Sequence, residues 1–312
     1  MANEKSFTGK KISVVVLNWN GIDDTLKCIE SVKRLDYPDY DIVVLDNGSK
    51  GDDIFILKKV KGINFIDNKD NLGFAEGNNV GINYALKNGA DAVFLLNNDT
   101  LIDSKALKHL ALKLFSDDKI GIVGPKIYYF DNKTLWFAGG TINYFVGDPH
   151  HIGDKELDHG QYNKESETDY ITGAAMLVKK EVFDKIGLLD KDFFAFYEEL
   201  DFNVRARKAG FGRWYVPKAK VKHKVSASAG RSSPMIIMLN MRNRLIFMRK
   251  NAPWYSWFTF PFFYLFTLVS LVIYKLFKLE FKCVSAALVG FFQGLAYRKK
   301  KVTGLIPDNK TA

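Results

Sequence analysis

The stretch "VFLLNNDT", residues 93–100, decides the fold, because it runs as an apolar strand and then breaks into Asn97, Asn98 and Asp99. Four consecutive apolar residues predict a central strand of a parallel sheet, in which helices cover both faces. In open α/β sheets the ligand lies at the carboxyl ends of the strands. The polar residues therefore have two interpretations: they line a ligand site, or they form a turn that caps the next helix.

The chain on both sides of this stretch alternates strand and helix. Strands are expected at 12–19, 40–49, 62–68 and 92–99, and helices at 23–35, 75–89 and 103–115. Further on, we expect a strand at 120–130, a strand-turn-strand at 136–148, a polar loop at 147–168, a strand and helix within 170–190 and a helix at 197–211. This order predicts an α/β fold with a mostly parallel, Rossmann-like sheet flanked by helices.

The C-terminal part is strongly apolar, since residues 251–274 and 283–297 carry no charge. Roughly 20 apolar residues are enough to span a bilayer as a helix. Basic residues flank both runs, which fits a membrane hairpin with both ends in the cytoplasm. The alternative is a pair of hydrophobic helices that pack on the domain or lie in the membrane interface.

Composition narrows the partners of this 312-residue chain. The net charge of +10 suits a nucleotide diphosphate, an acidic lipid surface or nucleic acid. Much of the basic surplus lies beside the apolar runs and no aromatic-basic platform is present, so we expect no nucleic-acid partner. Cys28 and Cys283 form neither a metal-ligand spacing nor a disulfide framework, as is typical of a reducing cytoplasm. P-loop and dinucleotide-binding glycine motifs are missing.

Polar side chains follow the other predicted strands as well. Asn18 and Asn20 follow the first strand, and Asp46 and Asn47 end the second. Because the carboxyl ends of parallel strands meet at one edge, we expect a cleft of amides and carboxylates there. Such a cleft suits a ligand with a base, a ribose and phosphates, and a carboxylate can hold a divalent cation that bridges two phosphates.

Seven segments taken together carry a family resemblance. They are "VVVLNWNG" (14–21), "VVLDNGSKGDD" (43–53), "NLGFAEGNNVGI" (71–82), "FLLNNDT" (94–100), "ITGAAMLVKKEVFDKIGLLD" (171–190), "FFAFYEELDFNVRARKAGF" (193–211) and "RNRLIFMRKN" (242–251). In this order they resemble a family 2 glycosyltransferase of the rhamnosyltransferase-like branch. The resemblance implies the GT-A fold.

The resemblance also implies a domain organisation. Residues 11–250 would form the GT-A domain, with a nucleotide-sugar-binding half at 11–120 and an acceptor half at 121–250. Hydrophobic, membrane-associated helices would occupy 251–300. Residues 1–10 and 301–312 would be tails.

The family's binding residues carry over to positions in these motifs. The positions implied to bind the nucleotide-sugar are Asn18, Asn20, Asp46, Asn47, Asn71, Gly73, Asn97, Asn98, Gly173 and Ala174. For Gly173 and Ala174, simple close packing is the alternative. Asp99 stands where the family's D-x-D motif ends and would hold Mg²⁺ or Mn²⁺, although the preceding amides are weaker cation ligands than carboxylates. His223 lies near a family histidine that is a further metal ligand; the alternative is a structural histidine.

The family's catalytic pair corresponds to Glu198 and Glu199 in "YEELDF". The second member of the pair would remove a proton from the acceptor hydroxyl, and here that member is Glu199. The alternative is a solvated helix face whose glutamates pair with lysine or arginine. Asp201 and Arg205, four residues apart on the predicted helix, are expected to form a structural ion pair.

The function implied is an inverting, metal-assisted transfer of rhamnose or a hexose. The donor would be dTDP-rhamnose or a UDP-hexose, and the acceptor a glycan or polyprenyl-linked saccharide in polysaccharide or cell-surface glycan assembly. Membrane lipid would contact the C-terminal helices, with the catalytic domain at the cytoplasmic face of the cell membrane. The alternative is a non-catalytic, membrane-associated nucleotide-sugar-binding protein of the same fold.

Overall fold

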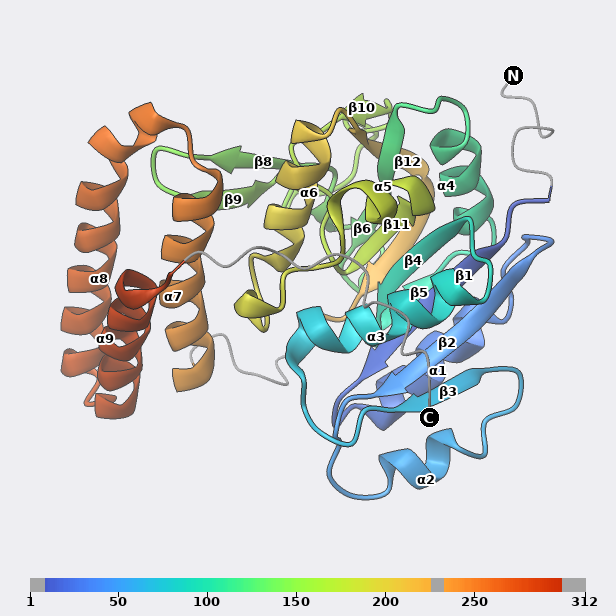
Figure 1. Ribbon diagram of the computed structural model, residues 1–312, viewed down its shortest axis with the longest axis horizontal. Coiled ribbons are helices and arrows are strands. Elements are labelled where there is room, and N and C mark those ends of the chain that lie inside the picture. Colours follow the sequence, from blue (N-terminus) through green and yellow to red (C-terminus); the bar gives the residue numbers. More distant parts are fainter. Residues whose placement is uncertain (1–8, 226–232, 299–312) are drawn as a thin grey trace, which may run out of the picture.

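The computed structural model describes residues 9–225 and 233–298, and its elements alternate in the first half as expected (Figure 1). Most of the expected tail 1–10, and the whole of 301–312, lie outside the described residues. The first half comprises β1 (Ile12–Asn18), α1 (Ile22–Val32), β2 (Tyr40–Asp46), α2 (Asp53–Leu57), β3 (Asn64–Asp67), α3 (Gly73–Lys87), β4 (Ala92–Asn97), β5 (Thr100–Ile102) and α4 (Ala106–Leu114).

The second half begins with mixed strands and ends in helices. Its elements are β6 (Ile120–Tyr128), β7 (Leu135–Phe137), β8 (Gly140–Asn143), β9 (Asp148–His151), β10 (Ser166–Glu167), β11 (Ala175–Lys179), α5 (Lys180–Ile186), η2 (Lys191–Phe193), α6 (Glu198–Lys208), β12 (Gly212–His223), α7 (Pro234–Asn251), η3 (Trp254–Phe258), α8 (Phe260–Phe277) and α9 (Phe281–Ala296).

One mixed sheet organises the core, with strand order β10-β12-β6-β11-β4-β1-β2-β3. β4, β1, β2 and β3 run parallel, β11 is antiparallel to both of its neighbours, and β12 is parallel to β6. The sequence prediction of a mostly parallel sheet with flanking helices and an apolar C-terminal helical region is confirmed. The β4 stretch is the central buried strand that its apolar run predicts.

Helices cover the parallel part of the sheet on both faces. α3 lies across β1, β2 and β4 in front of the sheet in Figure 1, and α1 lies behind it. Gly81 of α3 permits this close approach, because an added Cβ would come within 2.5 Å of a Val15 methyl and 2.8 Å of a Leu45 methyl. On α1, Cys28, Ile29 and Val32 are fully buried. Packing from both sides fixes the strand ends that the site uses.

The structure corrects the expected polar loop at 147–168. Residues 148–151 form β9, which pairs with β8 from Gly140↔His151 to Asn143↔Asp148, and residues 166–167 form β10. β9 consists of Asp148, Pro149, His150 and His151, so it carries no apolar alternation that would indicate a strand. Only the intervening segment is loop.

The C-terminal helices form a unit at the left of Figure 1, beside the sheet domain. α9 packs closely on α7, since a Cβ on Gly290 would lie 2.3 Å from the carbonyl oxygen of Met238. Among the described residues, α8 is the one helix that is long and apolar enough to cross a membrane, judged by length and composition; α9 is apolar but shorter. The divisions at 120/121 and 250/251 stay predictions.

Candidate active site

The ends of β1 and β2 meet in a buried polar contact. Asn18 and Asp46 are register partners and are fully buried. The Asn18 amide nitrogen donates to Asp46 Oδ1 at 2.8 Å and to Asp53 Oδ2 at 3.0 Å. Asp46 Oδ2 accepts from the backbone nitrogen of Ser49 at 2.9 Å. These bonds fix the loop after β2 against the end of β1.

Asn20 and Asn47 hold the neighbouring loops. Asn20 has a left-handed backbone (φ 52°), and its side-chain oxygen accepts from the backbone nitrogen of Lys50 at 2.7 Å. Asn47 donates to Asn71 Oδ1 and to the Gly73 carbonyl, both at 3.1 Å. The expected donor-binding residues of β1, β2 and the start of α3 therefore lie on one connected edge.

The amides of "NNDT" join β4 to both neighbouring elements. The backbone nitrogen of Asn97 donates to the Ala174 carbonyl at 2.9 Å. Asn98 donates through its amide to Thr25 Oγ1 at 2.9 Å, and Thr25 Oγ1 donates to Asn18 Oδ1 at 2.6 Å. The end of β4 is thus tied to the 173–174 segment on one side and to α1 and β1 on the other.

Asp99 and His223 form a close pair. Asp99 Oδ1 lies 3.0 Å from His223 Nε2, with side-chain exposures of 12% and 8%. Antiparallel pairing of β5 with β12, which sets Thr100 opposite His223, brings them together across a large sequence separation. His223 Nδ1 is buried and has no hydrogen-bond partner among the described residues. The His223 ring lies edge-on to Trp136, with 4.5 Å between centroids.

This pair fits a divalent cation that is also held by a diphosphate. In the described part of the chain no group of three or more His, Cys, Asp or Glu side chains is placed to hold a metal ion. Asp99 and His223 offer one carboxylate oxygen and one imidazole nitrogen. Mg²⁺ typically takes one or two protein carboxylates and completes its shell with substrate phosphates and water. The two residues are therefore sufficient only together with a phosphate ligand.

Glu198 and Glu199 open α6 in a desolvated position. Glu198 is 4% exposed, and its Oε2, like that of Glu199, is buried without a hydrogen-bond partner in the described residues. Burial and the charge of Glu199 raise the pKa of Glu198 well above its ordinary value, and burial also raises the pKa of Glu199. The interpretation of a solvated helix face is wrong for Glu198. Asp201 and Arg205 form the expected ion pair at 2.6 Å.

Gly173 connects this carboxyl pair to the strand ends. A Cβ on Gly173 would lie 3.4 Å from the Phe74 ring and 3.6 Å from the Cβ of Glu199. The next residue, Ala174, accepts the Asn97 backbone hydrogen bond. Ala174 and Asn97 are thus the contact between the β4 end and the segment that passes Glu199. Gly173 and Ala174 are both buried, and the missing side chain of Gly173 lets the Phe74 ring and Glu199 approach its backbone.

Sequence reasoning missed the loop that precedes α6. Phe194, Phe196 and Tyr197 have left-handed backbones, and the loop carbonyls accept hydrogen bonds from Arg242 and Asn243 of α7. The available signal was the polar run Arg242-Asn243-Arg244 directly before the apolar "LIFM".

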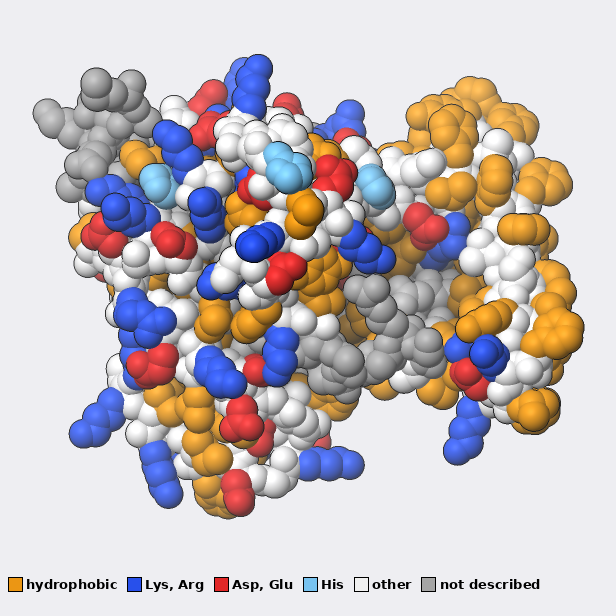
Figure 2. Space-filling view, turned by 180° about the vertical axis from the view of Figure 1, so that it is seen from behind, with side chains coloured by type: hydrophobic (Ala, Val, Ile, Leu, Met, Phe, Trp, Pro, Cys, Tyr) orange, Lys and Arg blue, Asp and Glu red, His pale blue; other side chains and the backbone are white. Residues whose placement is uncertain are grey.

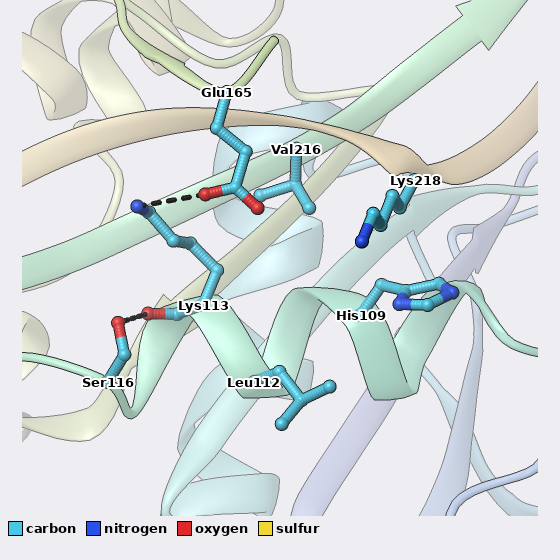
Figure 3. Close-up of a pocket in the computed structure, with 7 residues that line it drawn as sticks. All are labelled: His109, Leu112, Lys113, Ser116, Glu165, Val216 and Lys218. Carbon is cyan, nitrogen blue, oxygen red and sulfur yellow. Dashed lines mark hydrogen bonds and ion pairs between the residues drawn. The ribbon is translucent and has the colours of Figure 1, made fainter. Parts of the chain in front are cut away.

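A separate pocket of about 270 Å³ lies between α4, Glu165 just before β10, and β12 (Figure 3). His109, Lys113, Glu165 and Lys218 line it, and Lys113 Nζ pairs with Glu165 at 3.0 Å. It shares no residue with the predicted site. The strand-end region is therefore defined by its polar contacts rather than by this hollow.

Comparison with solved structures identifies the class of fold. The chain matches GalNAc-T7 with UDP, GalNAc and Mn²⁺ at a TM-score of 0.59 and 16% identity, over 75% of this chain and 47% of that one. It matches the mannosyltransferase PcManGT from Pyrobaculum calidifontis, in complex with GDP-Man and Mn²⁺, at a TM-score of 0.55 and 12% identity, over 91% and 87%. These likenesses show the GT-A fold.

The sequence comparisons then give the family. The family described as "Glycosyl transferase family 2" matches residues 13–187, more than half of the chain, and this chain belongs to that family. It is 25% identical to the low-salt glycan biosynthesis hexosyltransferase Agl10 of Haloferax volcanii, over 93% of this chain and 92% of that protein. It is 23% identical to the dTDP-rhamnosyl transferase RfbF of Shigella flexneri, over 67% and 71%. The family prediction is confirmed; the rhamnosyltransferase-like branch stays a prediction.

Proposed function

We propose that this glycosyltransferase moves rhamnose or a hexose, with inversion, from a dTDP- or UDP-linked donor to a glycan or polyprenyl-linked acceptor. The observation that carries the proposal is the buried Glu198–Glu199 pair beside Gly173, joined through Ala174 to the strand ends and to Asn97–Asp99. The relatives named as a hexosyltransferase and a dTDP-rhamnosyl transferase support this range of donors.

The proposed site residues fall into two groups, one that binds the donor and one that acts on the acceptor. On the donor side, Asp46 and the amides of Asn18, Asn20 and Asn47 set the loops that receive the base and ribose, together with Asn71 and Gly73. Asn97, Asn98, Gly173 and Ala174 border the sugar and diphosphate. Asp99 and His223 would hold Mg²⁺ or Mn²⁺, which when bound supplies positive charge that stabilises the departing diphosphate.

Glu199 acts on the acceptor side. Its carboxylate takes the proton of the acceptor hydroxyl while the hydroxyl oxygen bonds to the anomeric carbon, and the bond to the diphosphate oxygen breaks with its electron pair. Burial raises the pKa of Glu199, so this pKa lies closer to neutral pH than that of an exposed glutamate. Glu199 is therefore a stronger base than an exposed glutamate. Burial and the charge of Glu199 raise the pKa of Glu198 further, so the two neighbouring carboxyls ionise together less readily than one alone.

The apolar C-terminal unit supports a membrane-bound acceptor. Trp254, Phe258, Phe262 and Phe266 on η3 and α8 are each at least 70% exposed. Figure 2 shows hydrophobic side chains over the outer edge of this unit, at the right of the view. Exposed aromatic patches of this kind mark membrane or protein contact sites. We place the catalytic domain at the cytoplasmic face of a membrane, where a polyprenyl-linked acceptor is available.

The test of the reaction is a donor screen with a matched pair of variants. Detergent-purified protein is assayed with dTDP-rhamnose, UDP-glucose, UDP-galactose and UDP-N-acetylglucosamine, with and without Mn²⁺. Glu199→Gln is expected to lower transfer by about 10²–10⁴-fold and to keep donor binding, because general base catalysis contributes that much. Glu181→Gln, on the exposed side of α5, is the control and should transfer normally.

Two other outcomes of this assay would contradict the proposed reaction. Wild-type turnover by Glu199→Gln would remove Glu199 from the role of base. Donor binding without transfer by the wild type, with crude lipid-linked acceptor supplied, would favour the non-catalytic nucleotide-sugar-binding protein.

A further inference from the structure

The loop that leads into α6 holds an unfavourable backbone. Phe194, Phe196 and Tyr197 have φ values of 64°, 70° and 73°, a region that aromatic L-residues rarely adopt. Three such residues within four positions persist only when the surrounding structure determines them, and such clusters occur at functional sites. The loop ends where Glu198 and Glu199 begin α6.

Asn243 of α7 is one partner that determines this backbone. It is fully buried, and its amide nitrogen lies 2.8 Å from each of the carbonyl oxygens of Phe193, Ala195 and Phe196. The three carbonyls converge on one donor group, as they can only in a tightly turned chain.

Arg242 is the second partner. Its Nη2 donates to the carbonyls of Asp192 and Phe193 at 3.0 and 2.8 Å, and its Nε donates to the side-chain oxygen of Asn243 at 2.9 Å. The guanidinium therefore fixes the amide of Asn243 in the orientation that points its nitrogen at the loop.

The same loop reaches the donor edge. The Phe194 carbonyl accepts from the backbone nitrogen of Ala75 at 3.0 Å. A Cβ on Gly73 would lie 2.5 Å from the Phe194 ring, so the ring lies directly on the start of α3. One short segment thus touches the donor-side helix at Phe194 and carries the carboxyl pair four and five residues later.

We propose that Asn243 and Arg242 are positioning residues, which hold the carbonyls of residues 192, 193, 195 and 196 so that Glu199, the second residue of α6, lies beside Gly173. The proposal rests on the proposed role of Glu199 as base. Neither residue touches the reacting atoms; both act through the loop. We call the hydrogen bonds from Asn243 and Arg242 to this loop the clamp. Without the clamp, the loop relaxes toward ordinary backbone conformations, and the carboxyl pair moves with it.

The experiment compares two asparagines of the same helix. Asn243→Leu removes the three hydrogen bonds and keeps the same branched arrangement of side-chain heavy atoms. Asn240→Leu is the control, since the Asn240 amide donates to the Ile236 carbonyl within α7. Full-length protein in detergent is measured in two ways: turnover with UDP-glucose and dTDP-rhamnose, and hydrogen exchange of the amides in 194–201.

Asn243→Leu is expected to speed exchange in this segment and to lower kcat about 10- to 100-fold, because a misplacement of ~1 Å costs on the order of 100-fold. The donor KM should change little, and exchange outside 194–201 should match that of the wild type. A lower folded fraction would also lower apparent kcat at constant KM, but it would speed exchange throughout the chain. Asn240→Leu should leave both readouts unchanged. Arg242→Met should show the same pattern more weakly, with partial recovery in Arg242→Lys; this pair also replaces Asn243→Leu if that variant fails to fold.

Unchanged exchange in Asn243→Leu, or faster exchange with wild-type kcat, would overturn the proposal. If the wild type turns over no donor while Asn243→Leu speeds exchange, the proposed function fails and the clamp stands as a structural contact alone. The two failures are therefore distinguishable.

Discussion

At the scale of single residues, Glu198 is a carboxyl group whose burial gives the protein a pH-dependent stability. Its pKa is raised above the ordinary 4.5 by burial and by the charge of Glu199. The folded state therefore binds a proton more tightly than the unfolded state does, and this group's contribution to stability decreases as pH rises above about 4.5. Each tenfold difference in proton affinity corresponds to about 1.4 kcal/mol.

Glu198→Gln should remove this decrease in stability at higher pH, because the glutamine amide has no proton to release. We expect its Tm to exceed that of the wild type at pH 8 by more than at pH 5, measured by thermal unfolding in both buffers. Glu181→Gln, an exposed glutamate, should show the same difference from wild type at both pH values. A Glu198→Gln profile parallel to that of the wild type would mean that Glu198 ionises freely in the folded state.

Single residues also show how far the sequence predicts the site. Asn18 and Asp46 come together because parallel strands of known register end at one edge, which the apolar runs predict. The left-handed backbones of Phe194, Phe196 and Tyr197 have no such signal, since nothing in an aromatic side chain favours φ > 0. They depend on Asn243, about fifty residues downstream, and only the folded structure brings the two together.

At the scale of elements, the start of α3 depends on a glycine. Gly73 has φ 79°, and a Cβ there would lie 2.5 Å from the Phe194 ring and 2.6 Å from the Phe194 carbonyl oxygen. Gly73→Ala therefore combines a strained backbone with a collision against the loop before α6. We expect a loss of about 2–4 kcal/mol in the free energy of unfolding, measured by urea denaturation.

Gly51→Ala is the matched control for that substitution. Gly51 has φ 85°, and nothing lies within 4 Å of an added Cβ. Gly51→Ala should lower the free energy of unfolding by the backbone strain alone, about 1 kcal/mol. Equal losses in the two variants would show that the loop gives way freely at Phe194, contrary to the clamp by α7.

Elements differ in how well their patterns predict them. α1, α3 and α4 follow apolar spacing and appear within about three residues of the expected bounds, as is usual for strongly periodic helices. β12 extends over Gly212–His223 and was not expected, because Lys218, Lys220 and Lys222 interrupt its apolar residues. Its position is set by pairing with β6 and β5, and these are long-range contacts that local patterns do not contain.

At the scale of the whole molecule, α7 contacts both the loop before the carboxyl pair and the apolar helix α9. Its Arg242 and Asn243 hold the loop before the carboxyl pair, while α9 packs along it at Gly290 and Gly294. Arg249 of α7 also donates to the Gly294 and Leu295 carbonyls, at 3.1 and 2.7 Å. α7 therefore connects the apolar helices to the candidate catalytic residues. Attachment of α8 and α9 to a membrane, as proposed, would set the distance of the carboxyl pair from the membrane surface.

Membrane attachment is expected to depend on the exposed aromatic side chains of η3 and α8. Burying one large apolar side chain contributes about 2 kcal/mol, so three removals should lower vesicle binding by far more than tenfold. The variant Trp254→Ser/Phe258→Ser/Phe262→Ser is compared with the wild type by flotation with vesicles of phosphatidylcholine and phosphatidylglycerol. Phe55→Ser is the control, since Phe55 on α2 is 63% exposed but lies outside the apolar unit.

The wild type and Phe55→Ser should float with the vesicles, and the triple variant should stay in the soluble fraction. Extraction at alkaline pH then separates the two modes of attachment, because a spanning α8 resists it, whereas helices that lie in the interface are released. Added salt should weaken binding in the second mode more than in the first, since Lys278 and Lys282 beside the α8–α9 turn would contact anionic headgroups. Flotation of the triple variant at wild-type levels would assign the exposed aromatics to a protein partner instead of lipid.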